Sequence, residues 1–212
     1  FNENALDSIS TVLGNYSFNA PYQGRPAARV GEMFKRAWFR IVDASPVEGS
    51  RVRYWDKAGT AGGGARTAGV LINKALNGLF YVEDVVKGQW SAGEREAVIK
   101  QTAELDAQKH GHIEIWVEQE PGSGGKESAE NTVRMLAGFV IRSERVTGSK
   151  EVRAEPFAAQ CEAGNVRLVK GPWNAEYIEE MASVPNGKFM DQCDASSGAF
   201  NKLAGGNEVW IQ

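Results

Sequence analysis

The chain has 212 residues, of which 42% are hydrophobic and 24% are charged. Those values fit one sizeable globular domain, alone or with a short appendage, and no apolar run approaches the roughly 20 residues that a membrane-spanning helix needs. The net charge of −3 argues against a general polyanion-binding protein, which is usually basic, but it is compatible with a cluster of metal-binding carboxylates.

Two cysteines are too few for a disulfide framework. Both Cys161 and Cys193 fall within predicted helices, where a cysteine is usually a buried free thiol. The first residues also lack the charged and apolar regions of a signal peptide. We therefore expect a protein of a reducing compartment.

The N-terminal segment is predicted to lead into the main domain. Apolar residues at helical spacing predict an amphipathic helix over residues 1–14. Turn-forming Asn, Pro and Gly residues follow in 16–26, and a short strand is predicted at 40–42. We interpret residues 1–45 as a lead-in that lies ahead of the main sheet, and residues 46–212 as the main domain.

The remaining segments alternate between strand and helix patterns. Strands are predicted at 51–56, 66–75, 78–86, 113–117, 140–145 and 166–169. Helices are predicted at 91–110, 127–136, 150–163, 174–183 and 191–203. Ser91 and Glu94 have the spacing of a capping box at the start of the first of these helices. This order predicts an α/β fold with a mixed central sheet, whose first three strands are antiparallel and whose later strands are parallel, flanked by helices.

Acidic residues stand at the ends of three of these predicted elements. Asp56 ends the first long strand, and Glu118 and Glu120 share one face at the end of the fourth. Asp191 and Asp194 lie three residues apart at the start of the last helix, so they share a helix face. The simpler alternatives are that Asp56 starts a turn and that Asp191 caps the helix.

Taken together, these acids have the arrangement of a ribonuclease H-like nuclease site. Their hard oxygen ligands suit Mg²⁺ or Mn²⁺. Two such ions about 3.5–4 Å apart hold a scissile phosphate, prepare a water molecule for attack and stabilise the leaving oxygen. The sequence therefore predicts a two-metal phosphodiester hydrolase.

A glycine-rich turn is predicted at 120–125, before the helix that starts near Glu127. It differs from a nucleotide-binding phosphate loop, because Glu120 replaces the first required glycine and Glu127 replaces the serine or threonine that binds magnesium. Glycine permits close approach, so the turn is expected to bring backbone or Lys126 near a DNA phosphate.

Other charged residues carry weaker signals. A basic set on elements that could border one end of the sheet either contacts phosphates or forms a solvated surface: Lys126, Arg142, Arg145, Lys150 and Arg153. Four further acids are predicted to be solvated: Glu83, Asp84, Glu104 and Asp106. His110 and His112 are expected at the surface or in a turn, because no third zinc ligand lies nearby.

Several stretches resemble the C-terminal nuclease domain of the large terminase subunit of tailed bacteriophages, a DNA-packaging motor protein. They are residues 54–58 (Tyr-Trp-Asp-Lys-Ala), 116–126 (Trp-Val-Glu-Gln-Glu-Pro-Gly-Ser-Gly-Gly-Lys), 148–154 and 191–195. Residues 20–26 resemble the joint between the ATPase and nuclease domains of that family.

The resemblance implies a Mg²⁺- or Mn²⁺-dependent endonuclease with a ribonuclease H-like fold, which cuts concatemeric double-stranded viral DNA during genome packaging. It implies that Asp56, Glu118 and Asp191 are catalytic metal ligands, with Glu120 and Asp194 in support.

The chain departs from the family pattern at one point. It has Phe189, Met190 and Asp191 where many relatives have His-Asp-Asp. The loss of the acid at Met190 leaves open whether Asp191 alone, or Asp191 with Asp194, holds the second metal ion.

The resemblance also implies partners and a location. The expected partners are double-stranded DNA and, in the full motor, the portal ring and the small terminase subunit, at the procapsid portal in the host cytoplasm and with no membrane contact. The expected DNA contacts are Lys57, Lys126, Lys150 and Arg153. Residues 1–45 would join the nuclease domain to an ATPase domain, which is not part of the 212-residue sequence. The alternatives are another ribonuclease H-like enzyme, such as a resolvase or an integrase-type transferase, and a non-catalytic module that docks on DNA or the portal.

Overall fold

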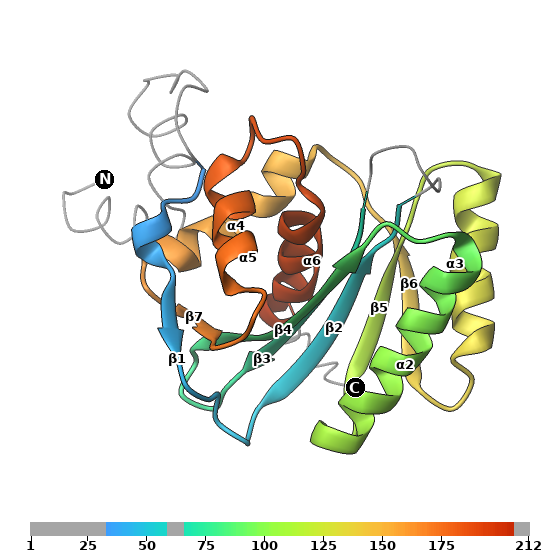
Figure 1. Ribbon diagram of the computed structural model, residues 1–212, viewed down its shortest axis with the longest axis horizontal. Coiled ribbons are helices and arrows are strands. Elements are labelled where there is room, and N and C mark those ends of the chain that lie inside the picture. Colours follow the sequence, from blue (N-terminus) through green and yellow to red (C-terminus); the bar gives the residue numbers. More distant parts are fainter. Residues whose placement is uncertain (1–32, 59–65, 206–212) are drawn as a thin grey trace, which may run out of the picture.

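A computed structural model describes residues 33–58 and 66–205 and arranges them as a seven-stranded sheet with helices on both faces (Figure 1). The strands are β1 (Arg40–Val42), β2 (Ser50–Asp56), β3 (Thr67–Lys74), β4 (Phe80–Gly88), β5 (Glu114–Gln119), β6 (Val140–Arg145) and β7 (Val166–Val169). The helices are the short 3-10 helix η1 (Arg36–Trp38), α2 (Ala92–His110), α3 (Ser123–Met135), α4 (Lys150–Glu162), α5 (Asn174–Ser183) and α6 (Asp191–Gly205). The helix predicted over residues 1–14 lies outside the described part of the chain.

The strand order is β1-β7-β4-β3-β2-β5-β6. Within this sheet β3 is antiparallel to both β2 and β4, whereas β5 and β6 continue parallel to β2, and β7 and β1 continue parallel to β4. The predicted mixed sheet is confirmed. All its strands except β3 are therefore parallel to one another, and the neighbouring strands β2 and β5 end side by side.

Side-chain alternation along β2 divides the hydrophobic interior into two cores. Tyr54 packs in the core between the sheet and α4, α5 and α6, whereas Trp55 packs on the opposite face against Ile99 of α2. Helices α2 and α3 cover that opposite face (Figure 1). Because successive side chains of a strand alternate in direction, Asp56 shares the face of Tyr54, beneath α6.

A β-bulge in β4 changes this alternation locally. The pairing between β3 and β4 skips Glu83. Val82 and Val85 consequently pack in the same core although they are three residues apart. Glu83 and its neighbour Asp84 both turn to the α2 face, where Glu83 accepts hydrogen bonds from Arg51 at 2.8 and 3.0 Å.

Helix α2 is tied to the sheet by a buried ion pair. Arg53 donates from Nε and Nη2 to the Asp106 carboxylate at 2.8 Å, and from Nη2 to Asp84 at 2.8 Å. The prediction that these acids are solvated is therefore wrong for Asp106 and for Glu83, which are 6% and 8% exposed. Burial of the arginines explains the difference, because a buried cation needs a carboxylate partner.

Two local predictions are confirmed. The Ser91 hydroxyl accepts a hydrogen bond from the backbone N–H of Glu94, and the Glu94 carboxylate accepts one from the backbone N–H of Ser91 at 2.9 Å, which completes the capping box of α2. Cys161 and Cys193 are free and buried, as predicted for cysteines within helices.

The sheet begins earlier than expected. Residues 40–42 form β1 and pair in parallel with 167–169, so the prediction that residues up to 45 lie ahead of the main sheet is wrong for this part. Phe34 and Phe39 are also buried in the α4–α6 core. A three-residue strand carries too little periodicity to be assigned to a sheet from sequence. The earlier part of the predicted lead-in, residues 1–32, lies outside the described residues.

The glycine-rich segment is helical where a turn was predicted. Helix α3 begins at Ser123 rather than near Glu127, directly after Gly122, whose φ is +94°. A Cβ on Gly125 would lie 2.2 Å from the Glu120 carbonyl oxygen. Glycine at this position therefore lets the first turn of α3 pack closely on the segment that follows β5, which is a helical use of a residue that usually indicates a turn.

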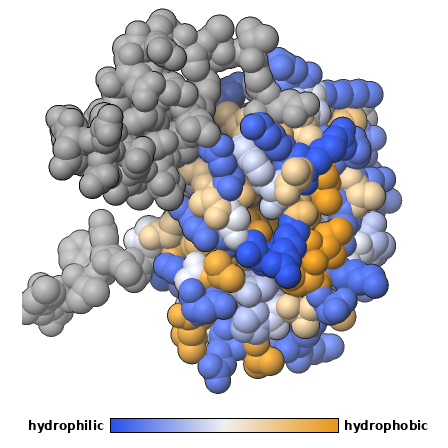
Figure 2. Space-filling model, turned by 90° about the vertical axis from the view of Figure 1, so that its left-hand side faces the viewer, coloured by the Kyte–Doolittle hydropathy of each residue, from blue (hydrophilic) through white to orange (hydrophobic). Residues whose placement is uncertain are grey.

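The surface of the domain is mixed in character. On the side that carries β1, apolar residues lie among hydrophilic ones (Figure 2). No helix in the described ranges combines the length and the apolar character that would let it cross a membrane.

Gly198 sets the distance between α6 and β2. A Cβ on Gly198 would lie 2.4 Å from the Tyr54 ring, so the helix can approach the strand only with glycine at this position. Asp194 lies about one turn earlier on α6, and Asp56 lies two residues after Tyr54 on the same face of β2. The contact between Gly198 and Tyr54 therefore helps to bring these two acids to the same end of the sheet.

Replacing Gly198 by alanine is expected to lower the free energy of unfolding by about 1–3 kcal/mol, because the added methyl group overpacks the contact with Tyr54. Urea unfolding followed by circular dichroism measures the change. Gly93→Ala in α2 is the matched control, since a Cβ there meets nothing within 4 Å. Equal stability of the two variants would contradict the close contact.

Candidate metal centre

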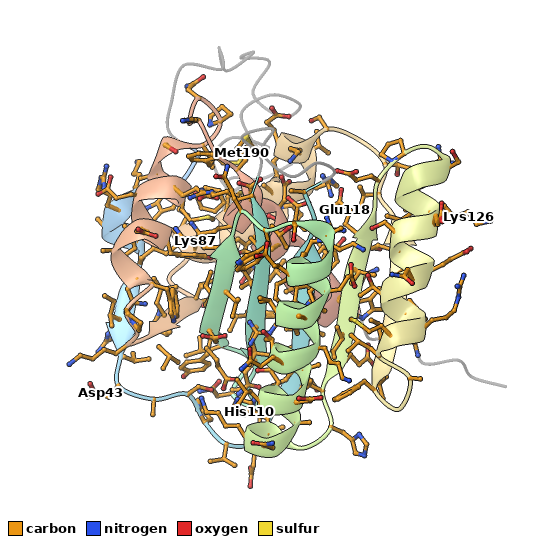
Figure 3. The ribbon with its side chains drawn as sticks, turned by 45° about the vertical axis from the view of Figure 1, so that its right-hand side comes forward. Asp43, Lys87, His110, Glu118, Lys126 and Met190 are labelled. Atoms are coloured by element: carbon orange, nitrogen blue, oxygen red, sulfur yellow. The ribbon has the colours of Figure 1, made fainter. Side chains whose placement is uncertain are left out.

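Two of the predicted metal ligands lie on neighbouring parallel strands, where those strands end. Asp56 is the last residue of β2, and Glu118 is the second-last residue of β5. The strands pair with Trp55 opposite Val117, so Asp56 and Glu118 follow at adjacent positions on the same face. Figure 3 shows Glu118 at the end of the sheet that lies toward Met190, the residue before α6.

Helix α6 brings two further acids to this end of the sheet. The backbone N–H of Asp194 donates to the Met190 carbonyl at 2.9 Å, so Met190 occupies the N-cap position. Asp191 is the first residue of the helix rather than its cap, which removes the simpler alternative for its carboxylate. The side chain of Asp194 is 3% exposed.

The four carboxylates influence one another electrostatically. Burial raises the pKa of Asp56 well above its ordinary value, and the negative charge of Asp194 raises it further. The ammonium of Lys150 opposes the rise, whereas the charges of Glu118 and Asp191 add to it. The structure therefore brings Asp56, Glu118, Asp191 and Asp194, which lie far apart in the sequence, into one cluster of like charges.

Two cations of α4 neutralise one side of this cluster. Arg153 donates to Glu118 at 3.1 Å and to Asp194 at 3.4 Å, and Lys150 donates to Asp194. Burial lowers the pKa of the Lys150 ammonium, but the charges of Asp56 and Asp194 outweigh it and raise that pKa above its usual value. Both cations were predicted as DNA contacts, and in this arrangement both face the acids.

Arg66 neutralises the other side. Its Nε donates to Asp191 at 3.4 Å, its Nη2 pairs with Glu180, and its guanidinium carbon lies 3.7 Å from the centre of the Phe189 ring. Glu180 also accepts hydrogen bonds from the backbone and side-chain N–H groups of Gln192, both at 2.6 Å. Sequence analysis missed Arg66 and Glu180, because no local spacing connects residues that are 114 positions apart.

The donor set suits a hard divalent cation, because carboxylate oxygens are the ligands that Mg²⁺ and Mn²⁺ prefer. In the arrangement described, Glu118 and Asp194 face Arg153 while Asp191 faces Arg66. Across residues 33–58 and 66–205, no three His, Cys, Asp or Glu side chains are grouped so that they could hold a metal ion as they stand. A metal ion would therefore have to replace these cations as the partner of the carboxylates.

Lys57 does not face the cluster. Its ammonium is buried and donates to the carbonyl and the hydroxyl of Ser128 at 2.9 Å and to the Thr132 hydroxyl at 2.8 Å. Burial lowers its pKa to about 8. Because all three donors of the ammonium are used inside the protein, this geometry argues against the DNA contact predicted for Lys57.

Lys126 and Glu120 lie at the border of the site or beyond it. The Lys126 side chain is 65% exposed and extends from the outer side of α3, away from Glu118 (Figure 3). Its ammonium lies 3.7 Å from Glu130. Glu120 follows β5, and its charge acts on the buried Lys57. The predicted support from Glu120 to a metal ion remains a prediction.

Comparisons with known proteins agree with this geometry. The family model described as a terminase RNaseH-like domain matches residues 53–203, a range that includes all four acids of the cluster. No curated protein sequence matches the chain.

Solved structures of phage proteins share the fold. The large terminase nuclease of the thermophilic phage G20c with bound magnesium superposes with a TM-score of 0.57 at 10% sequence identity, covering 82% of this chain and 99% of that one. Its form with bound zinc gives 0.56 at 11% identity, covering 81% and 98%. The nuclease domain of the Thermus phage P74-26 large terminase gives 0.56 at 9% identity, covering 82% and 95%. From the family match across most of its length, the chain belongs to the family of terminase RNase H-like domains.

Proposed function

We propose that this domain is a metal-dependent endonuclease that cuts concatemeric double-stranded viral DNA during genome packaging. Its family membership supports a role in a terminase. The observation that carries the proposal is the convergence of Asp56, Glu118, Asp191 and Asp194 at one end of the sheet, where burial and the charges of the other three acids raise the pKa of Asp56. Such repulsion between buried carboxylates is costly in a folded protein unless a cation joins them.

The proposed cofactor is Mg²⁺ or Mn²⁺, with two ions per site. The G20c relative whose structures contain magnesium and zinc supports a divalent cation here. When bound, the ions would activate a water molecule and stabilise the leaving oxygen of a phosphodiester. Asp56, Glu118 and Asp191 are the proposed principal ligands. We assign Asp194 a supporting role beside Asp191, because both lie in the first turn of α6 and the family's usual acid is missing at Met190.

The cations of α4 have a second role in this proposal. Arg153 and Lys150 neutralise the acids in the arrangement described. Metal ions would take over that neutralisation, and the two side chains would then be available for the phosphates of the DNA backbone. Lys126, exposed on α3, could add a contact to a longer duplex, whereas Lys57 is left out of the proposed interface.

The full motor supplies the rest of the proposed context. We place the domain at the procapsid portal in the host cytoplasm, joined through residues 1–45 to an ATPase domain. The portal ring and the small terminase subunit are its proposed protein partners. The family match supports this proposed location and these proposed partners.

The metal-ligand assignment predicts which substitutions abolish cleavage. Asp56→Asn, Glu118→Gln and Asp191→Asn are each expected to lower the rate of plasmid cleavage in Mg²⁺ or Mn²⁺ by about 100-fold or more, because metal binding supplies several kcal/mol of charge stabilisation. Gel electrophoresis of nicked and linear plasmid measures the rate.

Asp43→Asn is the control for this experiment. Asp43 is exposed and lies at the opposite end of the sheet from Glu118 (Figure 3), so its substitution should leave cleavage unchanged. Full activity in any of the three ligand variants would exclude that residue from the site. Absence of metal-dependent cleavage by the unaltered protein would contradict the proposed function itself.

The raised pKa of Asp56 predicts that Asp56→Asn, which should abolish cleavage, stabilises the folded protein when no metal is present. A carboxyl whose pKa is higher in the folded than in the unfolded state favours folding at low pH, and this contribution is lost as the pH rises through the folded-state pKa. At neutral pH without metal, Asp56 therefore destabilises the fold, because its ionisation is less favourable in the folded than in the unfolded state. Asp56→Asn is expected to raise the melting temperature in EDTA by about 2–4 °C, the shift that about 1 kcal/mol gives in a domain of this size.

Calorimetry in EDTA and in Mg²⁺ measures this effect. Added Mg²⁺ should raise the melting temperature of the unaltered protein and should have little effect on Asp56→Asn, since the ion binds only the folded state that keeps its ligand. In EDTA, the advantage of the variant should disappear near the ordinary carboxyl pKa of about 4. A variant that melts below the unaltered protein in EDTA at neutral pH would contradict the assigned repulsion.

A further inference from the structure

A polar cavity of about 230 Å³ adjoins the acid cluster. It lies between the end of β6, the segment that follows it, and helices α4 and α6. Its lining includes Arg145 and Thr147 on one side and Arg153, Asn201 and Lys202 on the other. Tyr54 and Gly198, the contact that holds α6 against β2, also border it.

The charge of this lining is predominantly positive. Arg145, Arg153 and Lys202 are cations, and Glu144 is the one carboxylate among the lining residues. Glu144 already has partners, because one of its oxygens accepts from the Tyr54 hydroxyl at 2.9 Å and the other pairs with Lys202. A ligand that enters the cavity therefore meets cations and hydrogen-bond donors, which favours an anion.

Of the three cations that line the cavity, Arg145 has the fewest contacts within the described part of the protein. It is exposed at the end of β6, and within the described residues its side chain forms no ion pair or hydrogen bond. Lys202, in contrast, is held in place by Glu144 and lies 3.9 Å above the Trp116 ring. One cation is thus positioned firmly and the other is left for a ligand.

Arg153 connects the cavity to the acid cluster. Its Nη1 and Nη2 atoms donate to Glu118 and Asp194, while its Nε has no partner in the described structure. The backbone carbonyl of Arg153 is fixed by Asn201 at 3.1 Å. An anion in the cavity would therefore lie on the other side of one guanidinium from the proposed metal ligands.

We propose that this cavity binds a backbone phosphate of the DNA strand, next to the phosphate that is cut. The inference rests on the proposed nuclease function and adds Arg145 and Lys202 as residues that position the substrate. A strand that reaches the acid cluster presents its neighbouring phosphates at the cavity, where the three cations neutralise them. Contact with phosphate rather than with bases makes this binding independent of DNA sequence.

Equilibrium binding tests the proposal without depending on cleavage. Fluorescence anisotropy of a labelled DNA duplex is measured in EDTA over a range of salt concentrations for the unaltered protein, Arg145→Gln and Lys202→Gln. Each variant should bind about fivefold more weakly. Each should also reduce the slope of log affinity against log salt by about 0.9, the change expected for one lost phosphate contact. A purely structural role for these residues would not change that slope.

Arg40→Gln is the matched control, because Arg40 is an exposed arginine on β1, at the opposite edge of the sheet from β6. Arg145→Gln carries the main test, since removal of an exposed side chain without internal partners leaves the fold intact. The proposal is overturned if Arg145→Gln matches Arg40→Gln in affinity and slope, or if the unaltered protein binds no duplex.

Cleavage kinetics separate this proposal from the proposed function. In Mn²⁺, Arg145→Gln should raise the KM for DNA about fivefold and keep kcat. Cleavage that is unaffected by the variant overturns the phosphate site and leaves the nuclease assignment intact. Weaker binding by the variant, in a protein that never cuts DNA, supports the site and contradicts the nuclease.

A free anion is the other possible source of the same chemistry. If the cavity needs a DNA strand, inorganic phosphate added at constant ionic strength should change the melting temperatures of the unaltered protein and of Arg145→Gln by the same amount. If phosphate stabilises only the unaltered protein, and the variant binds DNA normally, the cavity holds a free phosphate and the proposal is overturned.

Discussion

Repulsion between carboxylates is the constraint on which the arrangement of this domain depends. Asp56, Glu118, Asp191 and Asp194 come from three different elements; burial raises the pKa of Asp56, and the negative charges of the other three acids raise it further. Such a group is unfavourable unless cations accompany it. Arg66, on one side, and Lys150 and Arg153, on the other, provide that neutralisation within the protein. Three cations thus offset part of the charge of the four carboxylates before any ligand arrives.

This partial neutralisation of the acids connects the fold to the proposed chemistry. The parallel direction of β2 and β5 places two acids side by side, and Gly198 allows α6 to come close enough to add two more. The neutralising cations lie on α4 and directly before β3, and they contact the acids from two different elements. The same side chains can therefore serve the folded protein in one state and a polyanionic ligand in another, as long as divalent ions replace them at the carboxylates.

Much of this arrangement could be predicted from the sequence, because it is encoded locally. Alternation in β2 and β5 and the start of α6 were sufficient to place the acids at element ends, and the succession of elements was sufficient to predict a mixed sheet, although not its strand order. The ion pair of Arg66 with Asp191 spans 125 positions and has no local signal. The burial of Lys57 was also missed, because its partners Ser128 and Thr132 lie on a helix whose packing no pattern around Lys57 reveals.

The bulge at Glu83 has a consequence for the comparison of relatives. On either side of it, the inward and outward positions of β4 follow opposite parity, since Val82 and Val85 both enter the same core. At identities of 9–11%, the match of inward with inward positions is the main guide to a correct alignment. A relative that lacks the extra residue must be aligned with a one-residue gap at this position. Without the gap, the core-facing positions of half of the strand would be aligned with positions that face away from that core.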